Sequence, residues 1–158
     1  MSEPHRSRPR VPSTYKVPES EDTLLPWSHA REQLEHAQNF WVITASADAV
    51  PHATPLWGVW FRDRMYLEGH PATKWARNLA ANPYAIVHLD SSDNVVTVEG
   101  LCYDVPDVGD ELYEQVVSIY AAKYNGYRPE DHGFWVLTPK KAFAWTQFPQ
   151  TATRFTFE

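Results

Sequence analysis

The short β-branched and aromatic runs of this chain constrain its fold more than any other feature of the sequence. Runs rich in Val, Ile, Thr, Tyr, Phe and Trp favour β-strands, and clusters of Gly, Pro, Asp and Asn between them favour turns. Most of the runs are separated by links of hairpin length. The expected strands cover residues 40–46, 52–61, 64–69, 84–89, 94–105, 134–139, 141–148 and 153–157.

Three other stretches have helical periodicity. Ser28 is placed to cap a helix that runs to about Asn39. Residues 72–82 carry apolar side chains at helical spacing and end at Pro83, and Asp107 is expected to cap a third helix. Many strands with a few inserted helices predict an α+β protein around an antiparallel sheet, and a partly closed β-barrel is the simplest way to protect its edges.

Length, charge and cysteine content exclude several classes of protein. The chain has 158 residues, which suits one domain, and a net charge of −6 without a long basic stripe, which argues against a nucleic-acid partner. No apolar run approaches the ~18 residues of a membrane-spanning helix, so no membrane partner is expected. Cys102 is the single cysteine, which excludes an internal disulfide and fits a reducing, cytoplasmic location.

Residues 1–26 differ in composition from the rest of the chain. They contain five prolines, several basic residues and an acidic group at Glu19, Glu21 and Asp22. One interpretation is a flexible, disordered leader that precedes a domain of residues 27–158. The other is a basic arm that lies over a polyanionic ligand or a partner subunit.

The stretch "GHPATKWARNLAANP" (69–83) is the first candidate binding site. The first turn of a helix exposes backbone N–H groups and has a partial positive charge. Thr73 adds a hydroxyl and Lys74 an ammonium at this end, and Arg77 lies one turn on, where it can face the same side. This arrangement suits a phosphate, although a solvated first turn with a threonine cap is the alternative.

The strand "HATPLWGVWF" (52–61) is interrupted in a way that suits a ligand. Pro55 has no N–H to donate to a sheet, and Gly58 leaves a gap on one face. Trp57 and Trp60 are placed to flank a planar ring, although core packing is the commoner role of a tryptophan.

The chain resembles the flavin-binding split-barrel superfamily of pyridoxamine 5′-phosphate oxidase, and within it the actinobacterial flavin and deazaflavin oxidoreductases. The resemblance covers residues 27–158. It rests on the order of "PHATPLWGVWF", "TKWARNLAANP", "IVHL", "VVTVEG", "YAAKY" and "AFAWTQFPQTATRFTF". It implies an antiparallel split β-barrel with peripheral helices that forms homodimers, with cofactor sites between the subunits.

The resemblance also implies roles for particular residues. The stretch Thr54, Pro55, Leu56 and Trp57 would run along the flavin ring. Residues of the 69–83 stretch would hold the cofactor phosphate, and the C-terminal segment of the other subunit would close the site. The residues so assigned to the phosphate and to the closing segment are Thr73, Lys74, Arg77, Asn78, Trp145 and Arg154.

Some features depart from this family or exclude other sites. Trp75 stands where many relatives have a second basic residue, and the residues that bind pyridoxal phosphate in true oxidases are not evident. No Rossmann or P-loop glycine motif is present. The histidines at 52, 70 and 88 do not match a metal-ligand spacing, so no metal is expected.

Three functions are compatible with these features. The first is an oxidoreductase that uses FMN or the deazaflavin coenzyme F420 to transfer a hydride to or from a small conjugated or planar substrate. The basic arm favours F420, whose polyglutamate tail is anionic. The second is a non-catalytic carrier of flavin, deazaflavin or haem, and the third is a structural dimer with a vestigial site. His70 and Tyr66 are candidates for proton transfer, although no catalytic residue is assigned.

Overall fold

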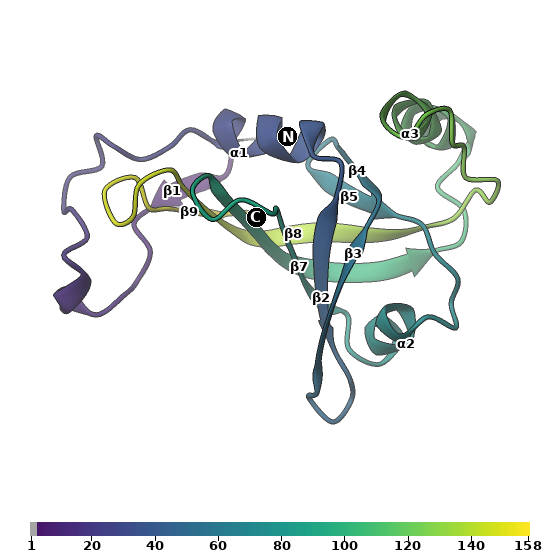
Figure 1. The fold of residues 1–158 in the computed structure, drawn as a ribbon, viewed down its shortest axis with the longest axis horizontal. Helices are drawn as coiled ribbons and strands as arrows, with labels where there is room; N and C mark the ends of the chain where they lie inside the picture. Colours follow the sequence, from purple (N-terminus) through teal and green to yellow (C-terminus); the bar gives the residue numbers. More distant parts are fainter. Residues whose placement is uncertain (1–2) are drawn as a thin grey trace.

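The computed structural model describes residues 3–158, which form one antiparallel sheet with three α-helices around it (Figure 1). The helices are α1 (Trp27–His36), α2 (Lys74–Ala81) and α3 (Asp110–Lys123), and Ser13–Tyr15 form a single 3-10 turn. The strands are β1 (His5–Ser7), β2 (Phe40–Ala45), β3 (Pro51–Leu56), β4 (Gly58–Phe61), β5 (Arg64–Leu67), β6 (Tyr84–His88), β7 (Val95–Val105), β8 (Phe134–Trp145) and β9 (Thr153–Thr156).

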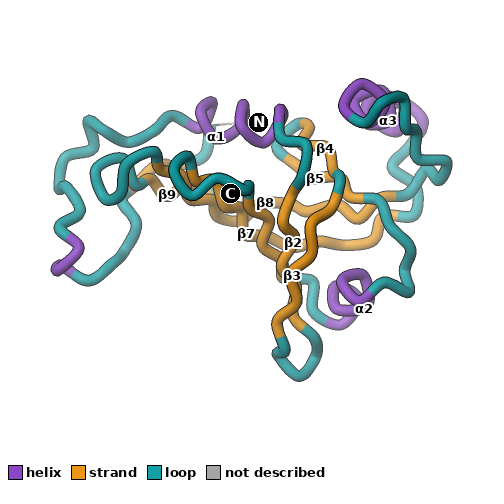
Figure 2. The backbone as a smooth tube through the Cα atoms, in the orientation of Figure 1, coloured by secondary structure: helices purple, strands orange, loops and turns teal. Residues whose placement is uncertain are grey.

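The sheet has nine strands in the described residues and follows the order β1-β9-β8-β7-β6-β2-β3 (Figure 2). The long strand β8 pairs with β5 through its first half and with β9 through its second half, and β4 pairs with β5. The path from β1 to β3 stays open, so the barrel is not closed. The predicted α+β class and split-barrel architecture are confirmed.

The expected strand 52–61 is wrong as a single element, because it breaks at Trp57 into β3 and β4. The hydroxyl of Tyr124 accepts a hydrogen bond from the Gly58 N–H at 3.0 Å. The same hydroxyl is the donor toward the carbonyl oxygens of Gly58 and Gln38, at 2.9 and 3.0 Å. The side chain of the residue that directly follows α3 thus occupies the point where the strand would have continued. Trp57 is turned outward at this break and is half exposed.

The two expected strands 134–139 and 141–148 are instead one strand, β8. The register of β7 against β8 shifts between Glu99 and Gly100, so Glu99 pairs with Lys141 and Gly100 with Pro139. This bulge lets β8 continue past Pro139. A Cβ atom at Gly100 would lie 2.2 Å from the carbonyl oxygen of Thr138, so only glycine fits this close approach.

Two of the expected helix starts are also displaced. The third helix begins at Asp110 after Gly109, and the carboxylate of Asp107 accepts a hydrogen bond from the Gly109 N–H instead of capping the helix. The first helix begins at Trp27, whose ring is fully buried and whose Nε1 donates to Asp63 at 2.9 Å.

Two apolar clusters form the core. The larger one joins α1 and α2 to the sheet, and the aromatic rings of Trp27, Trp60 and Phe155 meet edge-on inside it. The smaller one lies under α3, where Val116, Val117 and Tyr120 pack with their neighbours. None of the helices in residues 3–158 is long and apolar enough to cross a membrane.

The N-terminal segment lies along the sheet. Strand β1 pairs with β9, with His5 opposite Thr156 and Ser7 opposite Arg154. Arg8 then donates hydrogen bonds to the carbonyls of Ser20, Gln150 and Ala152 and to the hydroxyl of Thr23. The domain boundary at residue 27 stays a prediction.

Candidate cofactor site

The loop before α2 positions the N-terminal end of this helix. Thr73 is the N-cap, and its hydroxyl accepts a hydrogen bond from the Ala76 N–H at 3.4 Å. His70 orders the preceding turn, because its carbonyl accepts from the Thr73 N–H and its Nδ1 accepts from the Ala72 N–H. The backbone N–H groups of the first helical turn therefore point out of a fixed loop, as an anion site requires.

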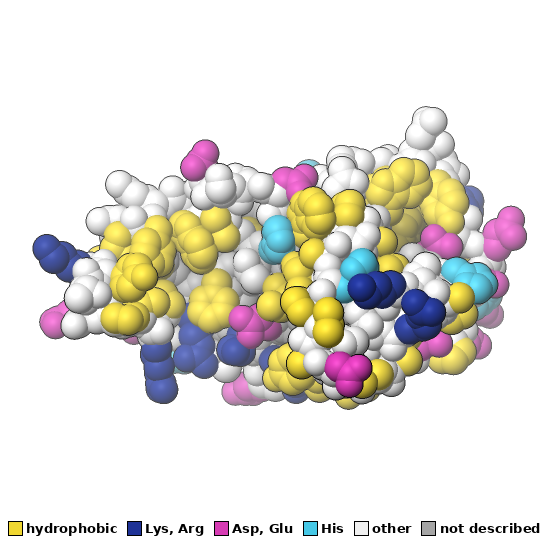
Figure 3. Space-filling view, turned by 60° about the horizontal axis from the view of Figure 1, so that its bottom comes forward, with side chains coloured by type: hydrophobic (Ala, Val, Ile, Leu, Met, Phe, Trp, Pro, Cys, Tyr) yellow, Lys and Arg dark blue, Asp and Glu magenta, His cyan; other side chains and the backbone are white. Residues whose placement is uncertain are grey.

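Lys74 and Arg77 provide the positive charge at this end. Both side chains are exposed, and neither forms an ion pair with any of residues 3–158. Figure 3 turns the α2 side of the molecule forward and shows basic and histidine side chains together beside apolar ones. Two cations without ion pairs beside a helix N-terminus suit an anionic group such as a phosphate.

Trp75 and Asn78 face the protein instead. Trp75 is buried and meets Trp135 edge-on, with ring centroids 5.7 Å apart, so it anchors α2 to the sheet. Its ring also lies 2.4 Å from where a Cβ atom of Gly69 would be, which explains the glycine in the loop. Asn78 is 6% exposed, and its Nδ2 donates to the Thr44 hydroxyl at 3.0 Å.

Strand β3 runs next to this helix as the last strand of the sheet path. α2 packs against β2 and also contacts β3. Thr54 pairs with Val42, and His52 pairs with Thr44, so both lie on the sheet face that Asn78 contacts. Leu56 pairs with Phe40 on this same face, whereas Pro55 is exposed on the other face opposite Trp41.

Trp57 is held rigidly at the end of this strand. Its ring stacks on that of Tyr124 with centroids 4.5 Å apart and an interplanar angle of 9°, and Tyr127 meets it edge-on. The hydroxyl of Tyr127 donates to Glu68 at 2.9 Å. An exposed indole supported in this way can stack against a planar ligand without losing further side-chain freedom.

Lys123 lies beside Tyr124, with its Nζ 5.4 Å from the centre of that ring. Its Nζ donates to the Gly58 carbonyl at 3.0 Å and lies 4.9 Å from the centre of the Phe40 ring. Burial lowers the pKa of Lys123 to about 8 and raises that of Tyr124. The pKa of Tyr127 is raised to about 12, first by desolvation and then by its bond to Glu68.

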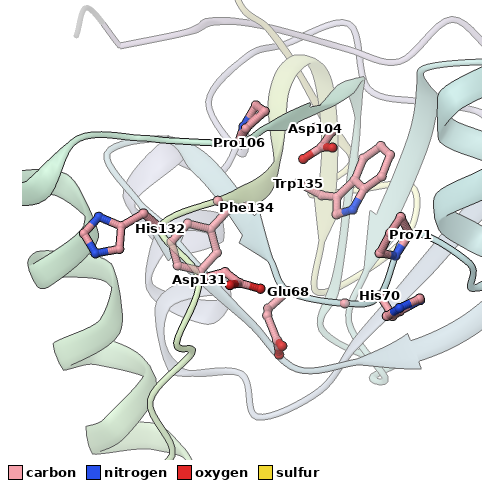
Figure 4. Close-up of a pocket in the computed structure, with 11 residues that line it drawn as sticks. Glu68, His70, Pro71, Asp104, Pro106, Asp131, His132, Phe134 and Trp135 are labelled. Carbon is pink, nitrogen blue, oxygen red and sulfur yellow. The ribbon is translucent and has the colours of Figure 1, made fainter.

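A pocket of about 420 Å³ opens beside the loop that leads into α2 (Figure 4). Figure 4 shows its lining from His132 on one side to His70 and Pro71 on the other, with Glu68 between them. The other acidic groups in its wall are Asp104 and Asp131. Three carboxylates repel a phosphate, so this pocket suits an uncharged or cationic group while Lys74 and Arg77 suit the anion.

Trp145 and Arg154 lie in a different part of the molecule. They line a second pocket, of about 500 Å³, at the far end of β8 and β9. Figure 1 places β9 at one end of the molecule and α2 near the other. A single chain therefore does not bring the ten predicted site residues together: those from Thr54 to Asn78 lie around β3 and α2, and the last two lie apart.

Sequence reasoning missed the acidic pocket and the two tyrosines, Tyr124 and Tyr127, that follow α3. Glu68 and Asp131 come from two separate links and Asp104 comes from strand β7, and no spacing connects them before the sheet forms. Tyr124 belongs to the motif "YAAKY" (120–124) and Tyr127 lies outside it, and no periodicity indicated that these two residues support Trp57. Tyr66 is 3% exposed and packs in the smaller core cluster, where burial raises its pKa, so it is poorly placed for proton transfer.

Comparison with solved structures shows the same architecture. An F420 reductase matches with 21% identity and a TM-score of 0.56, over 74% of this chain and 96% of that chain. A haem-binding protein from Mycobacterium smegmatis matches with 21% identity and a TM-score of 0.60, over 81% of this chain and 56% of that chain. A haem storage protein from Vibrio cholerae matches with 16% identity and a TM-score of 0.57, over 75% and 91% of the two chains.

These identities show a shared fold and leave function open. A search of curated protein sequences found no match. The sequence profile that describes pyridoxamine 5′-phosphate oxidase, however, matches residues 27–146, which is most of the chain. With the confirmed split-barrel sheet, this match shows that the chain belongs to the pyridoxamine 5′-phosphate oxidase family.

Proposed function

We propose that this protein binds a phosphate-bearing flavin, either FMN or the deazaflavin F420, and acts as an oxidoreductase on a small conjugated or planar substrate. The observation that carries the proposal is the N-terminal end of α2, where Thr73 caps the helix and Lys74 and Arg77 lie exposed and form no ion pair within residues 3–158. Such an end supplies backbone N–H groups and two cations to one anion. Strand β3 beside it offers an extended surface to a flat ring.

The ring system would lie along residues 54–57. Pro55 donates no backbone hydrogen bond, and Trp57 presents one face of an indole that is fixed on Tyr124. When bound, a flavin or deazaflavin supplies the hydride chemistry. The residues of this chain would bind the phosphate, orient the ring and hold the substrate over it, and no side chain is assigned a proton-transfer role.

A homodimer would complete the site. Trp145 ends β8 and Arg154 lies in β9, which Figure 1 shows well away from α2, so they would reach a cofactor held by α2 from a second copy. A two-fold dimer would then build two equivalent sites, each with residues from both chains. The fold similarity to an F420 reductase supports this proposal but stands at 21% identity.

Absorbance spectroscopy tests the proposal. Titration of the purified protein with FMN, and separately with F420, is expected to give a saturable shift of the flavin band, followed by turnover with a reductant and a conjugated acceptor. Riboflavin, which lacks the phosphate, is the matched control and is expected to bind at least about tenfold more weakly, because it loses a charge-assisted contact. Equal binding of riboflavin and FMN, or no binding of either cofactor, would contradict the proposal.

A second candidate is a non-catalytic carrier of a flavin, a deazaflavin or haem. Two of the similar structures are haem-binding or haem storage proteins, and His70 is an exposed histidine in the loop before α2. Tight binding of haem or flavin without turnover would favour the carrier. For haem, loss of the Soret band in His70→Ala would identify the ligand.

A further inference from the structure

A third pocket, of about 380 Å³, lies where the start of α3 meets the sheet. Its floor is a row of side chains on one face of β5, β8 and β7, since Tyr66 and Tyr103 both pair with Val136. Val108 and Leu112 form the wall on the side of α3. This volume lies within the range of small-molecule sites, about 300–1,000 Å³. None of the residues assigned above to the cofactor lines this pocket.

The hydroxyl of Tyr66 is a donor without a partner in this pocket. Tyr66 is 3% exposed, and its hydroxyl forms no hydrogen bond with any of residues 3–158. The neighbouring tyrosines differ, because Tyr113 donates to the Pro129 carbonyl and Tyr120 donates to the Tyr66 carbonyl. A buried phenol normally has a hydrogen-bond partner. Because Tyr66 lines the pocket, its unpaired hydroxyl is available to a molecule bound there.

Arg64 places a positive charge beside this hydroxyl. It lies two residues before Tyr66 on the same face of β5, and its guanidinium donates a hydrogen bond to the Thr138 hydroxyl. Burial raises the pKa of Tyr66, and the charge of Arg64 opposes this rise. Arg64 forms no ion pair with any of residues 3–158. Asp107, the one carboxylate that the described residues place in the pocket wall, accepts instead from the Gly109 N–H at 2.8 Å.

We infer that this pocket binds a small monocarboxylic acid with an apolar body. The Tyr66 hydroxyl and the Arg64 guanidinium both donate to the carboxylate, which makes the hydrogen bonds charge-assisted. Val105 and Leu112 contact the apolar body. The negative charge of Asp107 disfavours a second carboxylate on the ligand. This inference goes beyond the proposed function, because β5, β7, β8 and α3 form the pocket and α2 takes no part in it.

The probe is octanoate, and two control ligands share its chain length. Octanamide has no charge, and suberate carries a carboxylate at each end. Calorimetric titration of the full chain gives the affinities, and NMR of the methyl groups of Val105 and Leu112 reports where the ligand binds. We expect octanoate to shift the signals of both residues and to bind at least about tenfold more tightly than either control ligand.

Two substitutions remove the two donors separately. Tyr66→Phe and Arg64→Met are each expected to weaken octanoate binding about tenfold or more and to change octanamide binding less. Tyr66→Phe deletes a hydroxyl that has no partner within residues 3–158, so its Tm is expected not to fall. A loss of octanoate binding in this variant therefore comes from the missing donor and not from unfolding.

Arg62→Met is the matched control variant. Arg62 is exposed, its guanidinium lies 5.0 Å from the centre of the Phe61 ring, and it does not line the pocket. It is expected to leave octanoate affinity within about twofold. Equal losses in the Arg62 and Arg64 variants would overturn the inference, and so would octanamide that binds as tightly as octanoate.

Absence of octanoate binding, or of shifts at Val105 and Leu112, would also overturn it. A second copy of the chain that covers this surface would give that result. Octanoate is titrated without FMN, so failure of FMN to bind would remove the proposed flavin function and leave the octanoate result standing.

Discussion

The contact between Asn78 and Thr44 tests how α2 is held on the sheet. The two side chains are 6% and 2% exposed, and the Asn78 Nδ2 donates to the Thr44 hydroxyl at 3.0 Å. Thr44→Val keeps the shape of the side chain but leaves the Asn78 amide buried without this partner. Asn78→Leu likewise removes the donor and leaves the hydroxyl unpaired. Each is expected to lower the free energy of unfolding by about 1–3 kcal/mol.

The double variant separates the hydrogen bond from other effects. When both partners become apolar groups of similar shape, no buried polar group is left over. We expect its loss of stability to be smaller than the sum of the single losses by about 1 kcal/mol or more. For a chain of this size, 1 kcal/mol corresponds to a shift in Tm of about 2–4 °C.

Urea denaturation of the four proteins, followed by circular dichroism, gives the four free energies. Losses that add within about 0.3 kcal/mol would refute the hydrogen bond as the link between α2 and β2. The same variants also test the predicted cofactor role of Asn78. If its amide touches the cofactor, Asn78→Leu weakens FMN binding while Thr44→Val, which leaves that amide in place, does not.

Three further predictions concern single side chains. Lys74→Ala is expected to weaken FMN binding about tenfold to a hundredfold in an absorbance titration. Its Tm is expected to change little because alanine is a good helix former. Unchanged affinity for FMN would contradict the phosphate site. Burial lowers the pKa of Lys123 from 10.5 to about 8, so between these two pH values the unfolded chain binds more protons than the folded one. The free energy of unfolding is therefore expected to rise from pH 8 to pH 9.5. Urea denaturation of Lys123→Met is expected to show a smaller rise. Cys102 is buried in β7, and burial raises the pKa of its thiol to about 12. A thiol reagent is therefore expected to react with it at least about a hundredfold faster in urea than in the folded protein. Comparable rates would show that β7 opens readily in the folded protein.

Local sequence patterns predicted most of the strands because the formation of these strands depends on residues close together in the chain. The run "FWVITA" becomes β2, with Phe40, Val42 and Thr44 buried on one face, as its β-branched and aromatic residues indicate. Helix α2 likewise follows from Thr73 as cap and Pro83 as stop. These elements depend on residues that are close in the chain.

The features that the sequence did not predict depend on residues far apart in the chain. The break at Trp57 needs Tyr124, which directly follows α3 and accepts a hydrogen bond from the Gly58 N–H. Strand β1 has little β-propensity of its own, and it forms because β9 offers a free edge and Arg8 secures the following residues. The acidic pocket and the pocket at Arg154 are likewise assembled from separate links and strands, so no motif spacing marked them.

Mixing of subunits tests the shared cofactor site most directly. Lys74→Ala and Arg154→Gln are each expected to lose high-affinity FMN binding as homodimers. In a mixed dimer, one site carries both substitutions and the other carries neither. After the two variants are unfolded together and refolded at equal concentration, about a quarter of all sites should bind FMN with the parental affinity, if subunits pair at random. Absorbance titration of the mixture counts these sites. No recovery of high-affinity binding, with mixed dimers verified by mass spectrometry, would contradict a site built from both subunits.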